Sequence, residues 1–193
     1  MTKKWVVGID EAGRGPLAGP LSFGAVAMRP DALSLLEGIK DSKKLTERAR
    51  EQWHEALVSA AEVVAIYGEV NVLNIDALKM GKAIALGSRA IAKQMVRELK
   101  APIEDVLILL DGGLVAPNSY RQVSIIDGDD QVPIIAAASV IAKVRRDRVM
   151  RTLHCQYPQY HFNRHKGYGT KTHRDAIRQF GPSPEHRKSF TLL

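Results

Sequence analysis

Acidic residues recur at the ends of apolar runs in this sequence. The opening stretch KWVVGIDEAGRGP passes from a β-branched run into Asp10 and Glu11. The run VLILL ends in Asp111, and a later apolar run is followed by the letters DGDD. When helices cover a sheet, side chains just past the strand ends meet in a cleft. We therefore expect Asp10, Asp111 and an acid of the DGDD segment to converge.

Several carboxylates in one cleft predict a site for divalent cations. Without a cation they would repel one another, and their pKa values would rise. Hard oxygen ligands suit Mg²⁺ or Mn²⁺, which also share phosphate oxygens of a substrate. Two such ions, roughly 3.5–4 Å apart, can activate a water and stabilise the leaving oxygen in phosphodiester cleavage. That chemistry requires no His or Cys nucleophile.

Each acid also has a simpler interpretation. Asp10 can cap a turn, and Asp111 before two glycines can be an ordinary turn aspartate. Neighbours on a regular strand point to opposite faces, so we expect Glu11 to join Asp10 only if the strand has already broken. Spacing does not choose between the three acids of the DGDD segment, which are Asp127, Asp129 and Asp130.

The GRG letters that follow Glu11 predict a loop close to phosphate. Gly13 and Gly15 allow backbone N–H groups to approach a ligand closely. Arg14 adds a fork of donors that suits phosphate. A tight turn with a solvated arginine is the alternative, but next to a metal site the loop indicates a sugar–phosphate backbone.

Charge is unevenly distributed along the 193 residues. Residues 140–193 contain 12 Lys/Arg and 3 Asp/Glu, a net charge of +9, whereas residues 1–139 contain 16 and 18, a net charge of −2. A basic region of this kind favours a polyanionic partner such as nucleic acid.

Other features indicate an ordinary protein of the cytoplasm. No apolar stretch is long enough to span a bilayer, and residues 1–5 lack the apolar segment of a secretory signal. The lone Cys155 excludes an internal disulfide and fits a reducing compartment. We expect a cytoplasmic monomer without membrane contact.

Hydrophobic periodicity predicts an α/β protein with a mixed sheet covered by helices. The helix expected over 74–100 can be one long helix or two joined near Gly87, and the helix expected over 170–181 is led by Thr170 and closes near Gly181. The predicted polar side of the 136–153 helix carries Lys143, Arg145, Arg146 and Arg148. Strands are expected over 6–9, 21–28, 62–70, 106–110 and 122–126, and helices over 42–61, 74–100, 136–153 and 170–181.

Six motifs together resemble bacterial ribonuclease HII. They are GIDEAGRGPLAGP, DSKKL (41–45), LLDGG (109–113), AAASVIAKVRRD (136–147), HKGYGT (165–170) and HRKSF (186–190). They follow the family's order over nearly the whole chain. The resemblance implies an RNase H-like fold, with a catalytic core over residues 1–155 and a small, basic, helical substrate-binding region over residues 156–193.

The resemblance also implies a substrate and a reaction. Members of this family cleave the RNA strand of RNA–DNA hybrids and cut on the 5′ side of a single ribonucleotide embedded in duplex DNA. The products carry 3′-hydroxyl and 5′-phosphate ends. The expected cofactor is Mn²⁺ or Mg²⁺ in a two-ion site.

The family's functional residues map onto specific positions of this chain. Its metal-binding acids correspond to Asp10, Glu11, Asp111 and Asp129, although the family often has a basic residue where this chain has Asp127. Gly13, Arg14 and Gly15 match the loop that recognises the ribose 2′-hydroxyl and a flanking phosphate. Tyr168 matches a tyrosine that stacks on the deoxyribose after the ribonucleotide. The candidate phosphate contacts are Lys43, Lys143, His165, Lys166 and Arg187.

Three alternatives remain. A nucleic-acid-binding module without catalysis would use the acids as turn residues. A zinc protein would use His154, Cys155, His161 and His165, but the usual paired-ligand pattern is absent. Ribonuclease HIII shares the fold and the acids, but it carries an additional N-terminal domain, and only nine residues precede Asp10 here.

Overall fold

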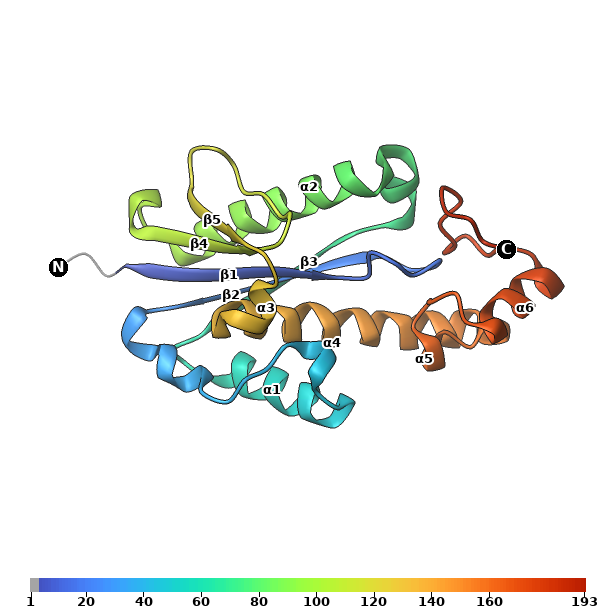
Figure 1. Ribbon diagram of the computed structural model, residues 1–193, viewed down its shortest axis with the longest axis horizontal. Helices are drawn as coiled ribbons and strands as arrows, with labels where there is room; N and C mark the ends of the chain where they lie inside the picture. The colour runs from blue at the N-terminus through green and yellow to red at the C-terminus, as the bar shows by residue number, and fades with distance from the viewer. Residues whose placement is uncertain (1–3) are drawn as a thin grey trace.

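A mixed five-stranded sheet forms the centre of the computed structural model, which describes residues 4–193 (Figure 1). The strands are β1 (Trp5–Ala12), β2 (Leu21–Met28), β3 (Val64–Val70), β4 (Val106–Asp111) and β5 (Arg121–Ile125). In space they follow the order β3-β2-β1-β4-β5. The β1–β2 and β2–β3 pairs are antiparallel, whereas β4 runs parallel to β1 and β5. The predicted mixed α/β sheet is confirmed.

Helices cover both faces of this sheet. In Figure 1, α2 lies on one side of the sheet, and α4 and α1 lie on the other. The α-helices are α1 (Glu47–Ser59), α2 (Val72–Leu99), α3 (Gly128–Gln131), α4 (Pro133–Gln156), α5 (Phe162–His165) and α6 (Lys171–Phe180). Short 3₁₀ helices cover Pro30–Leu36, Ser42–Lys44, Ile103–Asp105 and Pro158–Tyr160. Within residues 4–193, no helix combines the length and hydrophobicity needed to cross a membrane.

The two faces of the sheet bury separate hydrophobic clusters. On the α2 side, Phe23 and Ile108 pack with Ile91, and on the α4 side Val26 packs with Val140. All eight residues of β2 are buried, as expected for a central strand covered on both faces. This packing fixes the strand ends on which the acidic residues lie.

Helix α4 approaches the sheet unusually closely. A Cβ atom added to Gly24 of β2 would lie 2.2 Å from the carbonyl oxygen of Ala138. One added to Gly8 of β1 would lie 2.2 Å from the carbonyl oxygen of Ile134. Glycine at these two positions therefore allows α4 to lie directly against β1 and β2.

The long helix α2 is interrupted at a position that the sequence did not indicate. Lys79 has φ 65° and ψ 158°, which are not helical angles. Of the two alternatives for this helix, a joint near Gly87 is wrong, because the chain remains helical there. Gly87 instead gives space to an aromatic ring, since a Cβ atom at this position would lie 2.1 Å from a ring atom of Phe23.

The C-terminal region packs around a third hydrophobic cluster, which includes Tyr160, Phe162 and Ile177. The helix predicted after Thr170 is confirmed as α6, whose first turn is capped by the Thr170 side chain and whose C-cap is Gly181. In Figure 1, this region lies beyond one end of the sheet, next to α4.

A chain of hydrogen bonds links two fully buried histidines of this region. His173 Nδ1 lies 2.9 Å from the carbonyl oxygen of Tyr168, and the Nε2 atoms of His173 and His186 are 3.0 Å apart. The backbone N–H of Ser183 donates to His186 Nδ1. These contacts require neutral rings: His173 donates from Nδ1 to Tyr168, and His186 donates from Nε2 to His173. Burial lowers the pKa of both histidines to about 4.

We expect this pair to make folding stability depend on pH. Above about pH 6.5 both rings are neutral in the folded and unfolded chain. As the pH falls from 6.5 toward 4, the unfolded chain binds protons that the folded chain excludes, so stability is lost. By pH 5 the loss should reach about 1–2 kcal/mol for each histidine. Urea denaturation at a series of pH values between 7.5 and 5 measures this loss of folding stability.

Two variants isolate the contribution of the histidine chain. His173→Gln removes one ring of the pair and should make the pH dependence less steep, while lowering stability at neutral pH. The slope that remains includes His54 and His165, whose pKa values burial also lowers to about 4. His161→Asn replaces a histidine outside the chain and should retain the wild-type slope. An equally steep slope in His173→Gln would contradict this explanation.

Candidate metal centre and substrate cleft

Three carboxylates meet where the pairing of β1 with β4 ends. The parallel pairing of these strands ends at Ile9 and Leu110, and the next residues along the strands are Asp10 and Asp111. Each of Asp10, Glu11 and Asp111 offers one oxygen, and these oxygens all lie within 4.8 Å of one another. We call these three residues the acidic trio. The expected convergence of Asp10 and Asp111 is thus found in the structure.

Glu11 joins the trio without the strand break that we expected. Strand β1 continues through Ala12, with Glu11 opposite Phe23 on β2. The expectation was wrong because β1 loses its β4 neighbour after Ile9, which leaves space beside this edge for the side chains of both acids. Arg14 then binds Glu11, with 2.5 Å between Nε and Oε1.

Backbone amides hold Asp111 in place. Its Oδ1 accepts hydrogen bonds from the N–H groups of Gly128, at 2.8 Å, and Asp129, at 3.4 Å. Asp127, which precedes α3, has a left-handed backbone conformation with φ 51°. The turn into α3 therefore brings the DGDD segment against the end of β4.

The three acids of the DGDD segment have different surroundings. Asp129 is 5% exposed and lies beside the trio, and its charge raises the pKa of Asp10. Asp127 and Asp130 are exposed, and Asp130 pairs with Lys44. The carboxylate of Asp129 is bound by Lys43, with 2.8 Å between Nζ and Oδ2, and it is not one of the trio.

Electrostatics within the trio favour a bound cation. Burial raises the pKa of Asp10 well above its usual range, and the charges of Glu11 and Asp111 raise it further. Burial also raises the pKa of Glu11, although the guanidinium of Arg14 opposes this shift. A positive ion at the trio would relieve both the desolvation and the repulsion.

The donor set fits a hard divalent cation. All three ligands are carboxylates, which suit Mg²⁺ and Mn²⁺. In addition, Oε2 of Glu11 is buried and has no hydrogen-bond partner. A buried acceptor without a partner is costly, and coordination to a cation would satisfy it.

A cleft of about 310 Å³ opens beside the trio. Its walls come from the GRG loop, the DSKKL segment, helix α4 and the HKGYGT loop. The lining residues are Asp10, Glu11, Ala12, Gly13, Arg14, Gly15, Ser42, Lys43, Asp111, Ser139, Lys143, Arg146 and Tyr168. The four segments, distant in sequence, thus meet at one surface.

The expected recognition residues occupy the rim of this cleft. Tyr168 is 47% exposed, and a Cβ atom on Gly15 would lie 3.9 Å from its ring. The GRG loop and the HKGYGT loop are therefore direct neighbours. Arg14 projects between the trio and solvent, since its side chain is 45% exposed while it binds Glu11.

The candidate phosphate contacts do not share one environment. Lys43 and Lys143 line the cleft, where Lys43 pairs with Asp129 and Lys143 pairs with Asp147 at 2.6 Å. Lys166 donates from its side chain to the Asn163 carbonyl.

Two other predicted contacts have no free donors toward the cleft. His165 uses both ring nitrogens, one with the Tyr160 carbonyl and one with the Gly167 amide. Arg187 is 0% exposed and donates to backbone carbonyls of the GRG loop. In this structure neither side chain is placed to reach a phosphate.

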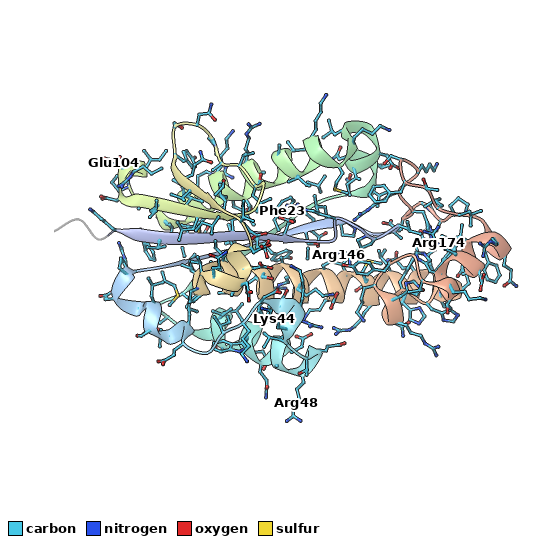
Figure 2. All side chains as sticks on the ribbon, in the orientation of Figure 1. Phe23, Lys44, Arg48, Glu104, Arg146 and Arg174 are labelled. Atoms are coloured by element: carbon cyan, nitrogen blue, oxygen red, sulfur yellow. The ribbon has the colours of Figure 1, made fainter. Side chains whose placement is uncertain are left out.

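Arg146 was misjudged as part of a polar helix side. It is 1% exposed and projects from α4 toward the sheet (Figure 2). Its guanidinium lies under the loop that begins at Gly13. No local signal separates it from Arg145 and Arg148, because all three stand in the same basic run.

The zinc alternative finds no support in the structure. Among residues 4–193, the acidic trio is the single group of three or more potential metal ligands close enough to share an ion. The rings of His154 and His161 lie 6.2 Å apart, and Cys155 is an exposed free thiol. Within the described residues, the candidate metal site is therefore the acidic trio.

Comparison with known proteins agrees with the resemblance that the sequence motifs carry. A family model described as Ribonuclease HII matches residues 7–193. A ribonuclease HII of Coxiella burnetii is 42% identical over 185 residues, covering 96% of this chain and 87% of the relative. A ribonuclease HII of Chlamydia pneumoniae is 44% identical over 188 residues, covering 97% and 84%.

Solved structures share the same architecture. A chain from the PCNA:RNase HII complex of Archaeoglobus fulgidus superposes with a TM-score of 0.76 at 26% identity, covering 96% of this chain and 95% of that chain. Bst-RNase HIII in complex with Mn²⁺ gives a TM-score of 0.76 at 19% identity, covering 99% and 68%. The second match indicates a common fold only.

The trio predicts that divalent metal stabilises the folded protein. Mn²⁺ or Mg²⁺ should raise the melting temperature measured in chelator, because a ligand of the folded state adds about 2.7 kcal/mol at 100 times its Kd. Asp10→Asn removes one charge from the trio, so it should melt higher than wild type in chelator and lose most of the response to metal. Thermal denaturation with and without metal tests both effects.

Asp130→Asn is the matched control, because it neutralises a nearby acid outside the trio. It should keep the wild-type response to metal. An undiminished metal response in Asp10→Asn would show that the trio is not the binding site.

Proposed function

The chain belongs to the ribonuclease HII family and is a metal-dependent ribonuclease H, and from this premise we propose a specific reaction. The enzyme hydrolyses the RNA strand of RNA–DNA hybrids and nicks duplex DNA on the 5′ side of a single embedded ribonucleotide. The products carry 3′-hydroxyl and 5′-phosphate ends. The observation that carries the proposal is the acidic trio beside a cleft with a glycine-rich loop and an exposed tyrosine.

The trio supplies the ligands for the cofactor. We propose that Asp10, Glu11 and Asp111 hold Mn²⁺ or Mg²⁺, with Asp129 as a fourth acid in the complex with substrate. When bound, a pair of such ions supplies an activated water and stabilises charge on the leaving oxygen. Oδ2 of Asp129 is bound by Lys43, so we propose that this ion pair opens or is shared when Asp129 takes this role.

The other walls of the cleft position the substrate. The Gly13–Arg14–Gly15 loop is proposed to bind the ribose 2′-hydroxyl and an adjacent phosphate, since a 2′-hydroxyl distinguishes RNA from DNA. Tyr168 presents a half-exposed ring next to this loop, where it can stack on the following deoxyribose. Lys143 and Lys166 add positive charge near the sugar–phosphate backbone, which fixes position without reading sequence.

The free cysteine and the basic C-terminal quarter bear on where the protein acts and on what it binds. We propose that the protein acts as a monomer in the cytoplasm on ribonucleotides left in DNA. The exposed free thiol of Cys155 supports a reducing compartment. The basic C-terminal quarter favours binding to the duplex through its phosphates.

The decisive assay uses a DNA duplex with one embedded ribonucleotide. Wild-type protein with Mn²⁺ or Mg²⁺ should produce a single nick on the 5′ side of that nucleotide, and chelator should abolish it. Asp10→Asn should bind the duplex but cleave at least about a hundredfold more slowly, because it removes a metal ligand. Gel analysis of the labelled strand measures both rate and position.

The result also separates the enzyme from a binding module. Asp130→Asn, which alters an exposed acid, should cleave at the wild-type rate. Binding to the duplex without cleavage in either metal would favour the module, and nicking at unmodified DNA positions would refute the proposed specificity.

A further inference from the structure

Two arginines are buried beneath the GRG loop without carboxylate partners. Arg146 is 1% exposed and Arg187 is 0% exposed. Within residues 4–193, neither guanidinium forms an ion pair with an acidic side chain. Burying an unpaired charge is costly unless hydrogen bonds replace its water. The hydrogen bonds that offset the burial of these two charges therefore need to be identified.

Arg187 directs all of its hydrogen bonds to a single loop. Its Nη2 donates to the carbonyl oxygens of Gly13, at 2.7 Å, and Pro20, at 3.0 Å. Nη1 donates to the carbonyl of Arg14, and Nε donates to that of Gly19, both at 3.0 Å. The planar guanidinium thus binds both ends of the loop at once.

Arg146 supports the same loop from helix α4. It donates to the carbonyl oxygens of Ala18, at 3.2 Å, Pro20, at 3.1 Å, and Lys166, at 3.0 Å. A Cβ atom on Gly13 would lie 2.2 Å from its Nε, so the loop lies directly on the arginine. Through Lys166 it also links the GRG loop to the HKGYGT loop.

The inward carbonyls determine where the loop amides point. In a trans peptide, the C=O of one residue and the N–H of the next point in opposite directions. Within residues 4–193 no peptide bond is cis. Since the carbonyls of Gly13 and Arg14 point to Arg187, the N–H groups of Arg14 and Gly15 point away from it. Neither N–H donates to a described protein group, and both residues line the cleft.

We propose that Arg187 is a positioning residue that orients the Arg14 and Gly15 amides toward the ribose 2′-hydroxyl and its phosphate. This inference rests on the proposed function and adds a residue that does not touch substrate. By fixing the loop, Arg187 contributes to the preference for a ribonucleotide. Its buried positive charge also attracts the sugar–phosphate backbone of the substrate.

The C-terminal segment that carries Arg187 is itself firmly held. The N–H of Arg187 donates to the carbonyl of Leu17, and the N–H of Gly19 donates to that of Glu185. Asp76 of α2 accepts hydrogen bonds from the backbone N–H groups of Lys188 and Ser189 and from the Ser189 hydroxyl. Arg187 is therefore held from both sides, as precise positioning requires.

Arg187→Lys tests the inference, because lysine keeps the charge but cannot bind four separated carbonyls. Binding is compared for two duplexes in the Asp10→Asn background, one with a single ribonucleotide and one entirely of DNA. The preference for the ribonucleotide duplex should fall about tenfold, as expected for lost hydrogen bonds. Affinity for the all-DNA duplex should change less than about twofold, because the net charge is kept.

Controls separate this role from a general structural one. Arg178→Lys makes the same change at an exposed site on α6 and should keep the full preference. With Asp10 intact, Arg187→Lys should keep the thermal response to Mn²⁺, because the trio is untouched. Full ribonucleotide preference in Arg187→Lys, or an equal loss of affinity for both duplexes, would overturn the proposal.

Asp76→Asn provides a second test if Arg187→Lys fails to fold. Asparagine accepts fewer of the three hydrogen bonds from residues 188–189, so it loosens the segment without touching the loop. Ribonucleotide preference should fall about two- to fivefold, and an unchanged preference would refute the inference. If the wild-type protein itself shows no preference and no nicking, the proposed function fails instead.

Discussion

Mutual repulsion among three carboxylates, of which Asp10 is buried and Glu11 and Asp111 are partly buried, is the constraint on which the rest of the site depends. The parallel β1–β4 pair places Asp10 and Asp111 side by side, and Glu11 reaches the same edge. Their proximity in a partly dehydrated cleft is unfavourable without positive charge. The surrounding structure offsets part of this repulsion, because amides of the first turn of α3 bind Asp111 and the guanidinium of Arg14 binds Glu11. The remaining oxygens are left for a metal ion.

Positive charge is placed around this centre in two different ways. Lys43 and Arg14 bind the acids directly and keep exposed side chains, so a substrate phosphate can replace or share their partners. Arg146 and Arg187 are buried and bind only carbonyls, so they act on the shape of the recognition loops. A negatively charged substrate would thus meet exposed cations beside the acids and buried ones beneath the loop.

The sequence predicted the sheet and the acidic strand ends because both follow from local patterns. Apolar runs and their terminal acids are visible within a few residues. Three features depend on tertiary contacts and were missed or misjudged: the continuation of β1 past Glu11, the interruption of α2 at Lys79, and the burial of Arg146 and Arg187. A solvated arginine and a buried one are identical in sequence. The contacts of Asp129 likewise depend on the packing of α3 against the end of β4, which local sequence does not determine.

The most direct measurement is anomalous diffraction from crystals of the protein soaked in Mn²⁺. The electrostatics of the cleft predict a manganese peak within coordination distance of carboxylate oxygens from Asp10, Glu11 and Asp111. Manganese bound elsewhere, or a trio whose oxygens are all engaged by lysine and arginine side chains while the metal is present, would contradict the claim that these acids form the metal centre.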